Sequence, residues 1–543
     1  MKTLFVHGTI YPLTEQGVRY SAMAVEKGKI AALGSDDEIL ALQDGNSRII
    51  DLQGKTVLPG FNDSHMHLLG YAAFSENINL AGATSVEEIC QRIERYREQN
   101  QIPKGQWIVG RGWNQDYFVR PEFPTKDQLD RVCPDHPVMM TRACGHAMVC
   151  NSKALELSGV TAKTPQVEGG LFEIGEDGTP NGVFREAAME LISSHIPAPT
   201  VEQLKRRILF AQQRLFESGI TSVQTDDFGS AGSPKQYEKV LEAYRQLEQE
   251  GLLKLRVCEQ CNLSQEKYLR DFLSKGYHLH RGGGRFRLGP LKILADGSLG
   301  ARTALLRQPY ADDPTTRGIA YYTPDELESY IALAHENGMQ VIVHCIGDGM
   351  MEQTMDILER VTQRMPREDC RHGIVHCQIT DLPLLRRFAH QELLAYIQPI
   401  FLHYDLHIVE QRVGKSLAAT SYNWKTLVES GVHCSIGSDC PVESFAPLPN
   451  LYCAVTRQDL EGYPAQGFYP QQRLSVWEAF RCFTAEGAYA TFEEKEKGLL
   501  LPGMAADLVM LSDDPFRCDR DPRQIKEISV EMTVCAGELV YQR

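Results

Sequence analysis

The chain has 543 residues, which is too long for one small domain but suits one large barrel with added modules. Hydrophobic residues make up 43% and charged residues 23%, which favours a globular protein with a sizeable core over a disordered one. The formal net charge of -15 argues against nucleic acid and anionic membranes as partners.

Three features bear on the cellular compartment. The apolar stretch at the start, MKTLFVHGTIYPL, is short and soon broken by His7 and Gly8, so it predicts a strand and not a signal peptide. No apolar run is long enough to span a bilayer. The 15 cysteines are scattered and odd in number, which indicates buried free thiols in a reducing compartment. We therefore expect a cytoplasmic protein.

The two ends of the chain share a pattern of short strands and turns. Residues 1–57 mix β-branched and apolar residues with glycines, and residues 496–543 return to that style. Because the termini of a domain often lie close together, we predict one small composite β-sandwich built from both ends.

Between these ends, residues 58–495 alternate between strands and helices. For example, TPDELESYIALAHENG has a helix-capping signature and a glycine stop, and the apolar strand MQVIVHCIGD follows it. Repeated alternation predicts a parallel sheet, and eight strands fit a closed (β/α)8 barrel of the TIM type. The predicted strands lie near residues 60, 223, 257, 292, 343, 375, 397 and 436.

Residues 105–185 break this alternation. They are rich in Gly, Pro and short apolar pieces such as WIVGRGWNQDYF and VMMTRACGHAMVCNS. We therefore expect a β-rich subdomain inserted after the first barrel strand.

The first barrel strand ends in a pair of histidines. Successive side chains of a strand alternate between its faces, so His65 and His67 point the same way. They follow the apolar VLPGF, which in a barrel marks the catalytic, carboxyl-terminal end. Two imidazoles on one face are natural zinc ligands, although a pair of surface histidines would have the same spacing.

Polar residues at the ends of other predicted strands favour the metal site. His344 ends QVIVHC, His376 ends GIVHC, Asp439 ends SIGSD, and Lys292 lies in GPLKILADG. Each alone would pass for a satisfied core residue, but the ends of different barrel strands converge at one mouth. Their common register therefore predicts a single metal site that includes the histidine pair.

Lys292 does not fit such a site in its usual charged form, because an ammonium group has no lone pair and repels a cation. One interpretation is a plain salt-bridge partner. The other is reaction of the amine with carbon dioxide, which would give an anionic carbamate able to bridge two metals.

With these residues in place, the chain resembles the amidohydrolase superfamily, in the branch of YtcJ-like metal-dependent hydrolases, the amidohydrolase-3 group. The resemblance covers nearly the whole chain. It rests on LPGFNDSHMHLLGY, GRGWNQD, RACGHAMVCNSKAL, NGVFREAA, LKILADGSLGARTA, VIVHCIGD, HGIVHC, SIGSDCPVES and GLLLPGMAADLVML.

The resemblance implies a role for each residue of the predicted site. The more buried metal would be bound by His65, His67 and Asp439. The second would be bound by His344 and His376, with Lys292 as a bridging carbamate. The expected metal is zinc or a similar divalent ion, one or two per chain. The expected reaction is hydrolysis of an amide-type C–N bond by metal-activated water, with Asp439 carrying the proton to the leaving amine.

Five further residues are weaker candidates for binding a small-molecule substrate, and they are Trp113, Asp116, His146, Asp296 and Arg302. The first three would line the pocket if the inserted subdomain covers the barrel mouth. The last two lie in the loop after Lys292, where binding residues usually sit. The alternatives are a packed tryptophan, a histidine bonded within its loop, and an Arg302 paired with a surface acid instead of a substrate carboxylate.

Other activities stay open at this stage. The same residues would serve a cyclic amide hydrolase, an N-formyl amide deformylase or a deaminase. A non-catalytic, metal-binding regulatory protein would have the same fold, although a complete ligand set argues against it. The resemblance also makes a homodimer an expectation.

Overall fold

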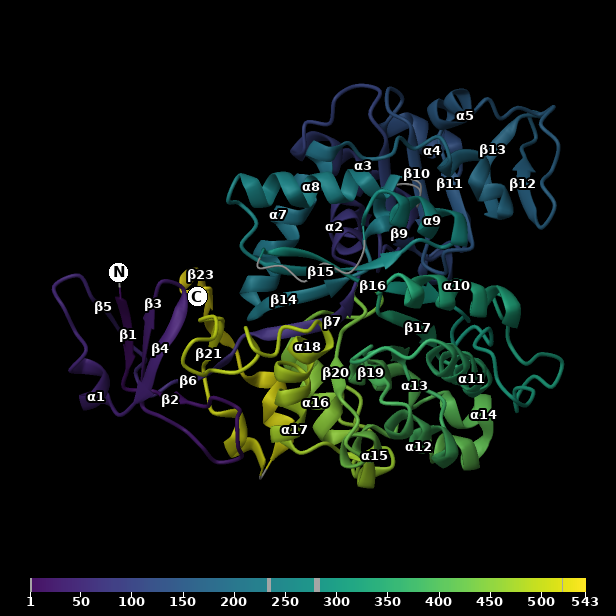
Figure 1. The fold of residues 1–543 in the computed structure, drawn as a ribbon. Coiled ribbons are helices and arrows are strands. Elements are labelled where there is room, and N and C mark those ends of the chain that lie inside the picture. The colour runs from purple at the N-terminus through teal and green to yellow at the C-terminus, as the bar shows by residue number, and fades with distance from the viewer. Residues whose placement is uncertain (1, 232–235, 278–283, 520) are drawn as a thin grey trace. The chain divides into compact units, whose positions relative to one another are not determined.

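The computed structural model describes residues 2–231, 236–277, 284–519 and 521–543. The chain forms two compact units, the first from residues 1–71 and 200–543 and the second from residues 72–199 (Figure 1). Among the helices of the described residues, none combines the length and the apolar character that crossing a membrane requires.

The first unit contains one eight-stranded parallel sheet, as the alternating pattern predicted. Its strands follow one another in chain order around the sheet, from β7 to β20. They are β7 (Phe61–Met66), β14 (Ile220–Thr225), β15 (Arg256–Asn262), β16 (Phe286–Leu294), β17 (Val341–Cys345), β18 (Gly373–His376), β19 (Leu394–Ile397) and β20 (Cys434–Ile436). The prediction of a TIM-like barrel is confirmed.

The first and last strands of this sheet meet just beyond their hydrogen-bonded ladders. The backbone N–H of Asp439 donates to the carbonyl of His65 at 2.7 Å. The N–H and the hydroxyl of Ser438 both donate to the carboxylate of Asp63, at 3.0 and 2.6 Å. These bonds bring the residues after β20 directly beside the histidine pair of β7.

Helices connect the barrel strands and cover their outer face. They include α7 (Val201–Glu217), α8 (Tyr237–Gln249), α9 (Glu266–Ser274), α10 (Pro324–Glu336), α11 (Asp348–Arg364), α12 (Leu382–His390) and α15 (Trp424–Glu429). Helix α10 begins as its sequence predicted, because Thr323 and Glu326 exchange capping hydrogen bonds at 2.9 and 3.3 Å. Gly338, with a φ of 78°, follows the end of this helix.

Two smaller sheets in the first unit share a hydrophobic core. One contains β1 (Lys2–Val6), β3 (Ala22–Glu26), β4 (Lys29–Gly34) and β5 (Arg48–Asp51). The other contains β2 (Thr9–Ile10), β6 (Thr56–Pro59), β21 (Leu508–Leu511), β22 (Val530–Cys535) and β23 (Glu538–Gln542). In this second sheet β6 pairs with β21, so strands from both ends of the chain lie side by side. Buried residues of both sheets, among them Phe5, Met23, Val57 and Leu508, pack in one cluster.

The second unit is built on a six-stranded mixed sheet. Its strands are β8 (Ile78–Asn79), β9 (Ile108–Trp113), β10 (Val138–Arg142), β11 (Ala147–Cys150), β12 (Gly170–Ile174) and β13 (Pro180–Glu186), and its helices include α3 (Val86–Gln99), α4 (Lys126–Val132) and α5 (Ser152–Ser158). The unit is wider than the 105–185 span expected from composition, because α3 and β8 also belong to it.

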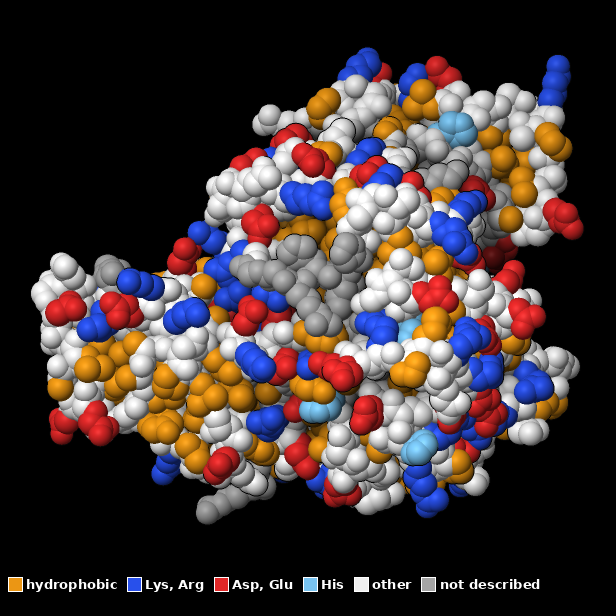
Figure 2. Space-filling model, viewed as in Figure 1, with side chains coloured by type: hydrophobic (Ala, Val, Ile, Leu, Met, Phe, Trp, Pro, Cys, Tyr) orange, Lys and Arg blue, Asp and Glu red, His pale blue; other side chains and the backbone are white. Residues whose placement is uncertain are grey.

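Surface charge and thiols follow the composition. On the face shown in Figure 2, acidic and basic side chains are interspersed. All 14 cysteines that the structure describes are free, and 12 of them are buried, which matches the expectation of mostly buried thiols. Cys144 is exposed and Cys370 is half-buried.

Candidate metal centre

The structure brings the predicted site residues to one end of the barrel. Four of them lie near the carboxyl ends of β7, β16, β17 and β18, and they are His65, Lys292, His344 and His376. Asp439 follows β20. The rings of His65 and His376 are 5.7 Å apart, and those of His344 and His376 are 4.4 Å apart. Because the carboxyl ends of parallel strands meet at one mouth, residues far apart in the sequence become neighbours here.

Asp439 lies at the centre of this group. Its Oδ1 is 3.1 Å from Nε2 of His67 and 3.3 Å from Nε2 of His65. Coordinating atoms of His65, His376 and Asp439 all lie within 4.8 Å of one another. Asp439 and His376 have φ angles of 58° and 82°, which are strained for residues with a Cβ. Strain of this kind is concentrated at functional sites, where the surrounding structure enforces it.

Hydrogen bonds on the far side of the rings leave Nε2 free in His65 and His376. Nδ1 of His65 is 2.5 Å from Oε1 of Gln260, and Nδ1 of His376 is 2.9 Å from Oε1 of Gln398. An amide oxygen only accepts, so each Nδ1 carries the proton. In the neutral imidazole the lone pair is then on Nε2, the nitrogen that a metal needs.

The other two histidines are held by backbone carbonyls. Nδ1 of His67 donates to the carbonyl of Asp226 at 3.1 Å, which again leaves Nε2 as the ligand atom. His344 is the reverse case, because its Nε2 donates to the carbonyl of Gly297 at 3.2 Å. Its free lone pair is therefore on Nδ1. All four rings have one nitrogen held by the protein and one left for a cation.

Lys292 is buried among these ligands, with 3% of its surface exposed. Burial lowers the pKa of its amine, although the charges of Asp226 and Asp439 oppose that shift. Within the described residues these two carboxylates act on the amine only through their charge, and no ion pair holds it. Burial thus favours the neutral amine, which has the lone pair that carbamate formation requires.

The electrostatics of the site favour one positive charge beside Asp439. Burial opposes ionisation of Asp439, but the imidazoles of His65 and His67 beside its Oδ1 outweigh burial and hold the pKa of the carboxyl well below its usual value. Burial also opposes protonation of His67, yet Asp439 and Asp226 raise the pKa of this imidazole to about 9. For His376 burial dominates and lowers the pKa to about 3.

This donor set fits a divalent metal ion. Imidazole nitrogens and carboxylate oxygens are the ligands that zinc and similar ions prefer. The lone pairs on Nε2 of His65 and His67 face the anionic Oδ1 of Asp439. Lone pairs that face a carboxylate repel it unless a cation lies between them, and either a metal or a proton supplies that cation.

The two candidate substrate residues of the first unit are both engaged by the protein. Asp296 is fully buried, and its carboxylate accepts backbone N–H groups of Leu305, Ile346 and Gly347 at 2.9 to 3.1 Å. It also lies 3.4 Å from Nε2 of His344, so it helps to hold that ring. Arg302 is paired with Asp312 at 2.9 and 3.1 Å. A substrate contact by either residue stays a prediction.

The three candidates of the second unit each contact another residue of that unit. Trp113 is fully buried in the core of the unit, and its indole N–H donates to the carbonyl of Met140 at 2.9 Å. Asp116 accepts a bond from Arg142 at 2.9 Å, and exposed His146 is 2.9 Å from Glu186. These contacts give each residue a partner within the unit, and their role in substrate binding stays a prediction.

Sequence reasoning missed three residues that contact the ligands, namely Asp226, Gln260 and Gln398. Each lies near the end of an apolar strand, in GITSVQTDD, LRVCEQC and LLAYIQP. The signal that identified His344 and His376, a polar residue at the end of an apolar strand, would also have found these three.

Comparisons with known proteins show the family to which the chain is related. The sequence model of the amidohydrolase family matches residues 48–541. Putative amidohydrolase YtcJ of Bacillus subtilis (strain 168) is 32% identical over 548 aligned positions that cover 100% of both chains. The N-substituted formamide deformylase of Arthrobacter pascens is 25% identical over 96% of this chain and 95% of its own length. The crystal structure of an uncharacterized metal-dependent hydrolase from Pyrococcus furiosus has a TM-score of 0.79 at 30% identity, covering 95% of this chain and 100% of that one.

Proposed function

The chain belongs to the amidohydrolase family of metal-dependent hydrolases that act on carbon–nitrogen bonds, and we propose that it cleaves an amide or N-acyl bond, with Asp439 as the proton carrier. The observation that carries this proposal is the position of Asp439. Its Oδ1 faces Nε2 of both histidines of the β7 pair, at 3.1 and 3.3 Å.

Six side chains would hold the metal. His65, His67 and Asp439 would hold one ion, His344 and His376 would hold a second, and Lys292 would contribute to both as a carbamate. When bound, the metal lowers the pKa of a water molecule and polarises the scissile carbonyl group. Zinc suits these ligands best, because they are nitrogen and carboxylate donors of intermediate hardness.

Asp439 provides the base and then the acid. Its carboxyl has a pKa held well below the usual value, so it is anionic at neutral pH and can accept a proton. It takes one proton from the attacking water as the new C–O bond forms. It then gives that proton to the leaving nitrogen as the C–N bond breaks, which restores the carboxylate.

Lys292 supplies the remaining negative charge. Its neutral amine attacks the carbon of carbon dioxide, an N–C bond forms as one C=O π pair moves onto oxygen, and the nitrogen gives one proton to solvent water, which leaves an anionic carbamate. Burial favours this reaction because it disfavours the ammonium form that has no lone pair. The carbamate then offsets part of the charge that two divalent ions bring into a buried site.

An N-formyl amide is the second candidate substrate. It is favoured by the similarity to the deformylase of Arthrobacter pascens, which extends over 96% of this chain. Both candidates use the same residues and the same proton transfers. They differ in the substituent on the carbonyl carbon, which is a hydrogen atom in a formyl group and a carbon group in a larger acyl group.

The test is a substrate screen with protein of defined metal content. Chelator-stripped protein is reloaded with one or two equivalents of zinc and assayed on N-acyl amines, N-formyl amines, cyclic amides and amino-substituted rings. We expect a free amine to be released only when metal is bound to the protein. Hydrolysis by stripped protein would refute the proposal, and release of ammonia from rings alone would replace it with deamination.

A further inference from the structure

The amide group of Gln260 has only one orientation that satisfies its surroundings. Its Nε2 donates to the backbone carbonyl of Ser64 at 2.9 Å, which an amide oxygen in that place could not do. Oε1 must therefore face Nδ1 of His65, 2.5 Å away. Gln260 is itself fully buried, so water does not compete for either contact.

Gln398 repeats this arrangement behind another ligand. Its Nε2 donates to the carbonyl of Tyr396 at 3.3 Å, and its Oε1 is 2.9 Å from Nδ1 of His376. Gln398 is 3% exposed. Gln260 on β15 and Gln398 just after β19 thus each supply an oriented amide oxygen to a histidine of another barrel strand.

We propose that Gln260 and Gln398 are positioning residues that hold His65 and His376 in the one neutral tautomer able to bind a metal, an inference that rests on the proposed metal-dependent function. The competing tautomer of His65 carries its proton on Nε2, where it would donate to Oδ1 of Asp439. That internal hydrogen bond would close the site, because the ring would then have no lone pair toward the cation.

The test compares Gln260→Met with Gln260→Glu. Methionine has a similar length but removes the acceptor, whereas glutamate keeps an oxygen in the same place. The dissociation constant for zinc is measured by competition with a chelator. We expect Gln260→Met to bind zinc about 10- to 100-fold more weakly, and Gln260→Glu to keep most of the affinity.

The tautomer itself is read from the 15N shifts of histidine in metal-stripped protein. We expect His65 to move from the Nδ1–H form toward the Nε2–H form in Gln260→Met alone. Gln224→Met is the matched control, because Gln224 is a buried barrel glutamine whose Nε2 donates to Gly487 at 3.1 Å and whose Oε1 has no partner among the described residues. It should leave the zinc affinity and the His65 shifts unchanged.

Two results would overturn the positioning role. One is wild-type zinc affinity with an unchanged tautomer in Gln260→Met. The other is an equal loss of affinity in Gln224→Met, which would make the effect one of general packing. Zinc binding is measured without turnover, so a protein that binds zinc in this way but hydrolyses no amide would refute only the proposed function.

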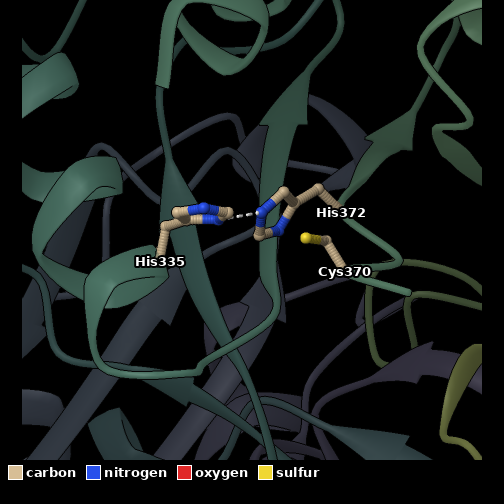
Figure 3. Close-up of side chains that lie close together, drawn as sticks. All are labelled: His335, Cys370 and His372. Carbon is tan, nitrogen blue, oxygen red and sulfur yellow. Dashed lines mark hydrogen bonds between the residues drawn. The ribbon is translucent and has the colours of Figure 1, made fainter. Parts of the chain in front are cut away.

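A separate histidine cluster lies at the amino-terminal end of the same strands. Coordinating atoms of His335, Cys370 and His372 are within 4.8 Å of one another (Figure 3). His335 is in the last turn of α10, and His372 directly precedes β18. Their proximity resembles that of a metal site, so the state of their nitrogens decides what the cluster is.

The hydrogen bonds of this pair form a chain with a fixed direction. The N–H of Val341 donates to Nδ1 of His372 at 2.9 Å, so the proton of that neutral ring is on Nε2. Nε2 of His372 donates to Nδ1 of His335 at 2.8 Å. Nε2 of His335 then donates to the carbonyl of Met365 at 2.7 Å. All four ring nitrogens are used, and no lone pair is left for a metal.

The geometry points to an acid-sensitive link between β17 and β18, made by the hydrogen bonds of the neutral His335–His372 pair. A proton added to His372 would go to Nδ1, which faces the N–H of Val341. A proton added to His335 would go to Nδ1, which faces the N–H of His372. In both cases two N–H groups would point at each other. Protonation must therefore break the chain of hydrogen bonds and release the amino-terminal end of β17.

The charged groups around the pair do not relieve this conflict. Arg367, which follows α11, donates to the carbonyl of His335 at 2.8 Å, and its positive charge opposes protonation of both rings. Glu336 on α10 favours protonation of His335 only weakly, and the thiol of Cys370 donates to the carbonyl of Arg367. From β17, the N–H of Val341 donates to the ring of His372, and from β19, the N–H of Leu394 donates to the backbone carbonyl of His372. A cavity of about 610 Å³ lined by His372 and Cys370 gives water a route to this end.

The sign of the pH effect follows from the buried rings. Burial lowers the pKa of His372 to about 3 and also lowers the pKa of His335. When the chain opens, each exposed histidine recovers a pKa of about 6.5 and takes up a proton. Opening therefore becomes easier as the pH falls below about 6.5, by about tenfold per pH unit for each histidine.

The test follows hydrogen exchange of a peptide that contains Val341. His335→Gln keeps an acceptor for His372 and a donor for Met365 but does not titrate. We expect wild type and His335→Gln to exchange alike at pH 8, and wild type to open about tenfold more than the variant at pH 5.5. His335→Leu should exchange faster at both pH values, because it breaks the chain outright.

Equal responses to pH in wild type and His335→Gln would overturn the acid-sensitive role. So would a zinc equivalent that is bound by wild type and lost in Cys370→Ser, because that result would make the cluster a metal site. Unchanged zinc content in Cys370→Ser supports the hydrogen-bonded chain.

Discussion

The two ends of the barrel each contain a close pair of histidines, yet only one pair is arranged to bind a cation. The rings of His344 and His376 are 4.4 Å apart, and those of His335 and His372 are 5.1 Å apart. At the carboxyl end each ring donates one N–H to an oxygen and leaves the other nitrogen free. At the amino end a backbone N–H occupies the last lone pair.

The difference shows that distance between ligand atoms does not by itself identify a metal site. What decides is whether the far nitrogen of each ring meets an acceptor or a donor. An acceptor leaves the near nitrogen with a lone pair, whereas a donor consumes the lone pair and completes a hydrogen-bonded chain. The comparison also assigns different roles to the two ends, chemistry to one and the joining of strands to the other.

The largest expected effect is at the carboxyl end, in Asp439→Asn. The amide keeps an oxygen near His65 and His67 but cannot carry the proton. We expect metal content close to that of wild type and a loss of kcat of about 10²- to 10⁴-fold. Steady-state kinetics and metal analysis on the same samples test this. A variant with full kcat would show that another group transfers the proton.

The next effect concerns Lys292→Ala. Loss of the carbamate removes the anionic bridge, so we expect the second metal to bind at least about 10-fold more weakly. Added acetate should restore part of the metal content and activity by supplying a carboxylate in its place. Full metal content in the variant, with no response to acetate, would rule out a bridging role for this lysine.

A direct test of the comparison makes the same change at two positions four residues apart. His376→Leu should lose metal, whereas His372→Leu should keep it. We expect His372→Leu to lower the free energy of unfolding by about 1–3 kcal/mol, because Val341 and His335 each lose a buried hydrogen-bond partner. Loss of metal in both variants would erase the distinction between the two ends.

The smallest expected effect is in Arg302→Met. Its guanidinium is exposed to solvent and paired with Asp312, and such pairs often contribute nothing measurable to stability. We expect an unchanged melting temperature and an unchanged KM for uncharged amides. A raised KM confined to substrates with a carboxylate would instead support the predicted role in substrate binding.

Local sequence patterns predicted much of the fold. The alternation of apolar strands and capped helices, as around Thr323 and Glu326, predicted the parallel barrel because each pattern depends on neighbours in the sequence. The limits of the second unit were harder to predict. Helix α3 has an ordinary amphipathic pattern, and nothing local shows that it packs with the later strands and not with the barrel.

The sequence by itself determined which side chains stand at the barrel mouth. The two-residue spacing of His65 and His67 places both on one face of β7, and a polar residue after an apolar strand marks its carboxyl end. Only the tertiary structure decided which nitrogen of each ring is free. That depends on Gln260, Gln398 and the carbonyl of Gly297, which arrive from other parts of the chain. Hydrogen bonds between distant segments have no local signature, so the sequence predicts the ligand residues and only the folded protein defines the ligand atoms.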